Sequence, residues 1–161
     1  MMLRVDRSVV RSGRRSGAKI LGRCLGGVVL TLTLLGAVGC DTNITDRDVE
    51  FISVGEAMVL KRESPDATIF LDPRPADSFQ QGHIPGARNL RLPDVPPNAA
   101  RERSLAEADM LIVYGDNPGT PASRGLAKRL LANGYSVVRL MQGGLDEWKA
   151  QGGEVRRPAS E

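Results

Sequence analysis

Three short runs of apolar residues constrain the fold of this 161-residue chain more than any other feature. The runs are Thr68–Leu71, Met110–Tyr114 and Ser136–Leu140, and each is typical of a strand that is buried on both faces. Between the last two lies an amphipathic segment, Pro121–Asn133, with Thr120 as its candidate N-cap. A strand, a helix and a strand joined by short turns predict a right-handed parallel unit, and therefore a small α/β domain with a mostly parallel sheet.

Shorter signals place the remaining elements. Val49–Ile52 is a candidate first strand, and Ser53 forms a capping box with Glu56 that opens a helix ending at Arg62. A further helix is predicted at Leu145–Gln151. The helix that begins at Pro121 carries one apolar stripe that we expect to pack on the sheet, made of Ala122, Leu126, Ala127, Leu130 and Leu131.

The positive net charge of the chain is confined to its first residues. The net charge is +3, yet residues 1–39 carry seven basic residues against one acidic residue, and residues 40–161 carry 15 basic against 18 acidic. The remainder is therefore slightly acidic, and only 4% of residues are aromatic, which argues against a nucleic-acid partner. One histidine and two cysteines exclude a His-cluster metal site and a disulfide-rich scaffold, so we expect no metal and no cofactor.

The basic segment is followed by an apolar run, residues 24–39, in the order of a secretory signal peptide. The end of the run, Ala37-Val38-Gly39-Cys40, resembles a bacterial lipobox. The resemblance implies cleavage before Cys40, a diacylglycerol on its sulfur and an acyl chain such as palmitate on its new amino group, which together give stable anchoring. Two alternatives are an uncleaved signal anchor and an ordinary cleavage site nearby with Cys40 left as a free thiol.

These signals divide the chain into four parts. We predict a lipoprotein signal peptide at 1–39, a lipidated cysteine with a short polar linker at 40–48, a folded domain at 49–155 and a tail at 156–161. The domain is expected at a bacterial cell envelope, outside the cytoplasm, held to a membrane by the lipid on Cys40 and facing the periplasm if the cell is Gram-negative. Its protein partner in the envelope is not indicated by the sequence.

Three motifs in the predicted domain together resemble a rhodanese-like domain. Asp72–Phe79 resembles the family's Asp-x-Arg-x-x-x-x-Phe segment, Gly82–Asn89 its Gly-His-Ile-Pro-Gly-Ala-x-Asn turn, and Gly143–Trp148 its closing Gly-Gly-x-x-x-Trp. The resemblance covers Val49–Val155 and implies a single domain with a five-stranded, mostly parallel sheet flanked by helices.

Most residues of these motifs have architectural explanations. Asp72 and Arg74 are expected to form a partly buried charge pair or to bond to backbone near the carboxyl ends of the strands. His83 is the only imidazole of the chain, but we favour a role in fixing its turn over a role as catalyst. The other motif residues suit turns and packing, and they are Gly82, Pro85, Gly86, Gly143, Gly144 and Trp148.

The residue that would carry the family's chemistry is absent. The resemblance implies a cysteine directly after the run Met110–Tyr114, where loop amides and a helix N-terminus would stabilise its thiolate. Gly115 stands at that position. The rest of the equivalent loop also departs from the family, because Asp116 adds a negative charge and Thr120 stands where an arginine is often found; the whole loop is Gly115, Asp116, Asn117, Pro118, Gly119 and Thr120.

Three functions remain open at this point. The favoured one is a membrane-anchored, catalytically inactive rhodanese-like module, which we expect not to be an enzyme and to act in recognition or in sensing a small ligand at the envelope. The second is a sulfurtransferase-related enzyme that uses the loop Gly115–Thr120 without a cysteine nucleophile; Ser123 lies nearby but lacks a general base unless His83 reaches it. The third is an anion-binding protein that uses the amides of the same loop.

Overall fold

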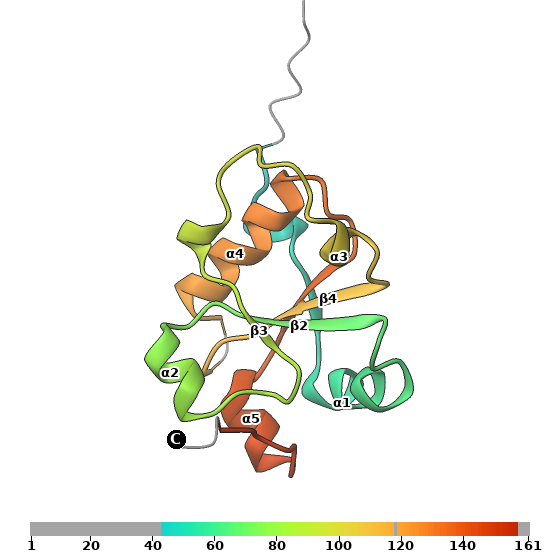
Figure 1. The fold of residues 1–161 in the computed structure, drawn as a ribbon, viewed down its shortest axis with the longest axis vertical. Helices are drawn as coiled ribbons and strands as arrows, with labels where there is room; N and C mark the ends of the chain where they lie inside the picture. Colours follow the sequence, from blue (N-terminus) through green and yellow to red (C-terminus); the bar gives the residue numbers. More distant parts are fainter. Residues whose placement is uncertain (1–42, 118, 158–161) are drawn as a thin grey trace, which may run out of the picture. The chain divides into compact units, whose positions relative to one another are not determined.

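The computed structural model describes residues 43–117 and 119–157. Five parallel strands form one sheet in the order β1-β5-β4-β2-β3 (Figure 1). The strands are β1 (Glu50–Ile52), β2 (Thr68–Asp72), β3 (Arg88–Asn89), β4 (Met110–Val113) and β5 (Val138–Met141). The predicted fold class, an α/β domain with a five-stranded sheet flanked by helices, is confirmed, and the sheet is parallel throughout.

The three apolar runs form the three central strands of this sheet. β4 lies in the middle and pairs with β2, where Thr68 is opposite Met110, and with β5, where Leu111 is opposite Val138. Its residues Leu111–Val113 have no exposed surface. Parallel strands covered on both faces need this continuous apolar character, which explains why the sequence pattern identified them.

Helices cover both faces of the sheet. They are α1 (Val54–Glu63), α2 (Ala76–Gln81), α3 (Arg103–Ala106), α4 (Pro121–Ala132) and α5 (Gly144–Ala150), with short 3-10 turns at Asp46–Asp48 and Leu92–Asp94. One core packs α4 against the sheet and contains Leu71, Val113, Leu126, Leu130 and Leu140. The other lies on the side of α1 and α5 and contains Phe70, Ile84, Ile112, Tyr114 and Trp148 (Figure 1).

Several local predictions are confirmed and others need correction. The capping box of Ser53 and Glu56 is present at the start of α1. The predicted stripe on α4 is wrong at Ala122, which is exposed, whereas Ser123 is buried. The strand expected from Ser136 begins two residues later, at Val138. Helices α2 and α3 and strand β3 had no clear periodic signal because each has only two to six residues.

The predicted signal peptide at 1–39 and Cys40 lie outside the described residues. Among the helices that the structure describes, none is both long enough and apolar enough to cross a membrane.

Candidate functional site

The side chain of Arg74 connects the loops at the carboxyl edge of the sheet. Its guanidinium donates to the carboxylate of Asp72 from Nε (2.9 Å to Oδ1) and from Nη2 (2.7 Å to Oδ2). Nη2 also donates to the carbonyl of Gly82 (2.7 Å), and Nη1 donates to Oδ1 of Asp116 (2.6 Å). Asp72 is fully buried and Arg74 is 7% exposed. One arginine therefore joins the end of β2, the turn before β3 and the loop after β4.

Two pKa values in this cluster are shifted upward, for different reasons. Burial by itself disfavours the charged guanidinium, but the hydrogen bonds to Asp72 and Asp116 outweigh this effect and raise the pKa of Arg74. Burial, together with the nearby Asp72 carboxylate, raises the pKa of the Tyr114 phenol. Tyr114 consequently stays neutral, and its hydroxyl accepts a hydrogen bond from the backbone amide of Ile84 (3.2 Å).

His83 contacts both its own turn and the C-terminal segment. Its ring stacks on Phe79 at a centroid distance of 3.8 Å, and its Nδ1 lies 2.9 Å from the Phe79 carbonyl. Its backbone exchanges two hydrogen bonds with Arg156, so residues just after the predicted domain end pair with the motif. This geometry agrees with a role for His83 in fixing the turn.

The start of α5 supports the loop after β4 through backbone contacts. Gly143 and Gly144 have φ values of 86° and 59°, which favour glycine. The amide of Leu145 donates to the Gly115 carbonyl (2.8 Å), and that of Asp146 donates to the Asp116 carbonyl (2.8 Å). A Cβ at Gly144 would lie 2.7 Å from both carbonyl oxygens. Gly144, the second glycine of the closing motif, therefore permits the start of α5 to approach the loop after β4 this closely.

The space beside Gly115 is filled by Thr120. A Cβ at position 115 would lie 3.2 Å from Cγ2 and 3.3 Å from Cβ of Thr120, and closer still to its Oγ1. The Thr120 hydroxyl also lies 2.8 Å from Oγ of the buried Ser123. Thr120 is the N-cap residue of α4, as predicted, although its side chain accepts no hydrogen bond from a backbone amide of the helix.

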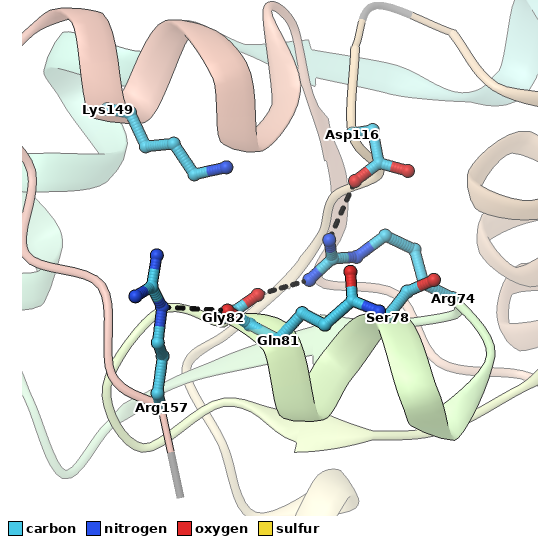
Figure 2. A pocket seen from close by; sticks show the side chains of 7 residues that line it. All are labelled: Arg74, Ser78, Gln81, Gly82, Asp116, Lys149 and Arg157. Atoms are coloured by element: carbon cyan, nitrogen blue, oxygen red, sulfur yellow. Dashed lines mark hydrogen bonds and ion pairs between the residues drawn. The ribbon is translucent and has the colours of Figure 1, made fainter.

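A polar pocket of about 660 Å³ opens next to this loop (Figure 2). Its lining residues come from α2 and the loops on either side of it, the β4–α4 loop, α5 and the C-terminal segment, and they are Arg74, Ser78, Gln81, Gly82, Asp116, Lys149 and Arg157. Arg74, Gly82 and Asp116 were singled out from the sequence, whereas Gly115, Thr120 and His83 do not line the pocket. Lys149 and Arg157 were missed, since a single surface cation carries no motif.

Among the residues that the structure describes, no group of three or more His, Cys, Asp or Glu side chains is placed to hold a metal ion. The groups that line the pocket are amide, hydroxyl, cationic and one carboxylate, a set suited to hydrogen bonding with a polar ligand.

An all-parallel α/β sheet with a loop and a polar pocket at its carboxyl edge defines the open-sheet class, in which ligands bind at that edge. The family model "Rhodanese-like domain" matches residues 56–151, more than half of the chain. The chain belongs to the rhodanese-like domain family.

Proteins that this chain resembles in sequence or in fold come from several bacteria. The chain is 29% identical over 101 residues to thiosulfate sulfurtransferase GlpE of Pseudomonas putida, covering 63% of this chain and 87% of that one. The rhodanese-like domain of an Anabaena protein is 25% identical with a TM-score of 0.55, covering 69% and 86% of the two chains. A Bacillus halodurans protein has a TM-score of 0.60 at 20% identity, covering 69% and 79%, which is a likeness of fold alone.

We predict that Gly144→Ala destabilises the domain more than Gly152→Ala. Both glycines have positive φ (59° and 81°), but a Cβ at Gly152 meets nothing within 4 Å. Gly152→Ala should cost about 1–2 kcal/mol from the backbone alone. Gly144→Ala should cost roughly 1–3 kcal/mol more because its Cβ overlaps two carbonyls. Urea unfolding, monitored by the fluorescence of Trp148, the only tryptophan, measures the loss of unfolding free energy in both variants. Equal losses would contradict the close approach of Gly144 to the carbonyls of Gly115 and Asp116.

We also predict that positions 115 and 120 are coupled. Gly115→Cys should destabilise the chain by about 1–3 kcal/mol because its Cβ overlaps the Thr120 side chain. Thr120→Ala removes Oγ1 and Cγ2, so the double variant should recover about 1 kcal/mol or more relative to the sum of the single variants. If the destabilisation of the double variant equals the sum of the two single variants in the same unfolding measurement, the Thr120 side chain does not restrict the size of the residue at position 115.

Proposed function

We propose that this chain is a catalytically inactive rhodanese-like module that acts in recognition at a bacterial cell envelope. The observation that carries the proposal is Gly115, which occupies the loop position where the family resemblance implies a cysteine. Sulfur transfer by this family's route needs a thiolate that attacks the donor and holds the sulfur as a persulfide. A glycine has no side chain to attack with.

The loop geometry supports loss of catalysis over replacement by another nucleophile. The Thr120 hydroxyl lies beside position 115, but it is engaged with Ser123, and Ser123 donates to the Thr120 carbonyl. His83 points its Nδ1 at the carbonyl of Phe79 and does not line the pocket. Neither hydroxyl has a base within its observed hydrogen bonds, so a hydroxyl-based reaction at this loop lacks the group that would activate it.

The proposed anchor is the lipid on Cys40. The apolar run and the lipobox-like residues Ala37–Cys40 support it, as does the sharp change in charge after residue 39. Only nine residues separate Cys40 from Glu50, the first residue of β1, so a lipid on Cys40 would keep the domain close to the membrane surface.

The purified full chain in mild detergent should form no thiocyanate from thiosulfate and cyanide above the rate without protein. Thiosulfate sulfurtransferase GlpE of Pseudomonas putida, assayed in the same detergent, provides the positive control. Mercaptopyruvate serves as a second sulfur donor. Turnover by this chain comparable to that of the control would overturn the proposal that the loop is inactive.

Cell fractionation tests the anchor. In a bacterial host, the wild-type chain should appear in the membrane fraction and incorporate labelled fatty acid, because the thioether lipid requires the Cys40 sulfur. Cys40→Ala should lose the label, and Cys24→Ala serves as the matched control because it lies before the predicted cleavage site. Equal labelling of the Cys40→Ala variant and the wild type would contradict lipidation at this position.

A further inference from the structure

Two basic side chains that lie eight residues apart in the sequence enter the polar pocket. Lys149 extends from α5, and Arg157 extends from the C-terminal segment towards the same open space (Figure 2). The Arg157 Nε donates to the carbonyl of Gln81 (3.0 Å), which holds its guanidinium against the end of α2. Within residues 43–117 and 119–157, Arg157 forms no ion pair, so its charge is available to the pocket.

The acidic groups near the pocket offset these two charges only in part, because Asp72, Arg74 and Asp116 together carry one net negative charge. Asp116 is the only carboxylate among its lining residues, and it is bound to Arg74 at 2.6 Å on the opposite wall. Asp146 lies 3.9 Å from the Lys149 Nζ, a long and exposed contact on the same helix. Exposed pairs of this kind contribute little, so Lys149 can exchange Asp146 for a ligand at small cost.

Neutral donors complete the lining of the pocket. The hydroxyl of Ser78 and the amide of Gln81 both line the pocket from α2. Among the described residues, neither side chain forms a hydrogen bond with another protein group, and each can donate one to an oxygen atom of a ligand. Two cations with hydroxyl and amide donors match an oxyanion, and charge-assisted hydrogen bonds to such a group are the stronger ones.

We infer that this pocket binds an anionic group, a carboxylate or another oxyanion, between Lys149 and Arg157. The inference rests on the proposed recognition role and names the chemistry that the module would recognise. The binding groups are side chains of α5 and of the C-terminal segment, not the amides of the loop Gly115–Thr120. The anionic group can belong to a small free ion or to acidic side chains of a protein.

The test measures binding to the full chain in detergent by isothermal titration calorimetry, with sulfate and with a synthetic peptide of four consecutive glutamates as separate probes. We expect saturable binding of at least one probe. The variant Lys149→Gln/Arg157→Gln should weaken it about tenfold or more. The matched control is Arg62→Gln/Arg156→Gln, which removes the same charge from exposed residues outside the pocket and should change affinity less than about twofold.

The variant Asp116→Asn tests independently whether the anion binds in this pocket. The substitution removes the only lining carboxylate and frees the Arg74 Nη1, so an anion in this pocket should bind about three times more tightly or better. Binding of sulfate would assign the site to small ions, and binding of the peptide alone would assign it to protein carboxylates; both support the inference. No saturable binding of either probe, or equal weakening by the pocket and control variants, would overturn it while leaving the sulfurtransferase result unaffected.

Discussion

The buried arginine at the carboxyl edge of the sheet is the interaction on which this site depends. An arginine residue that is only 7% exposed requires partners for its guanidinium donors, and Arg74 obtains them from Asp72, Gly82 and Asp116. These three partners belong to the end of β2, the turn before β3 and the loop after β4. Leaving a buried charge unpaired is costly, so the folded state fixes these three segments relative to one another. Arg74, Gly82 and Asp116 form part of the pocket lining.

The hydrogen bond from Arg74 to Asp116 changes the expected effect of the Asp116 carboxylate on the charge of the pocket. From the sequence alone, its carboxylate is a negative charge in the loop where an anion is expected to bind. In the structure it is the second carboxylate bound to Arg74, so the cluster of Asp72, Arg74 and Asp116 carries one net negative charge. The electrostatic character of the pocket is then decided by residues outside the loop, namely Lys149 and Arg157. The missing thiol and the positive pocket are therefore separate properties of the chain.

The sequence allowed the central strands and the longer helices to be predicted because burial on both faces and capping leave local patterns. Strands β2, β4 and β5 and helix α1 are examples. Short elements such as β3 and α2 escaped because so few residues carry no periodicity. The pocket cations escaped for a different reason: Arg157 meets α2 only because the C-terminal segment pairs with His83, a contact across more than seventy residues. Long-range pairing of this kind leaves no local signal.

The contacts between α5 and the loop after β4 are made by main-chain atoms. The amides of Leu145 and Asp146 hold the carbonyls of Gly115 and Asp116, and neither hydrogen bond depends on a side chain. These two hydrogen bonds therefore do not depend on which side chains the loop carries, provided that position 144 is glycine. A loop supported in this way can serve as a grafting position: side chains other than that of Asp116, which binds Arg74, can be exchanged for others of compatible size while the main-chain contacts with α5 are kept.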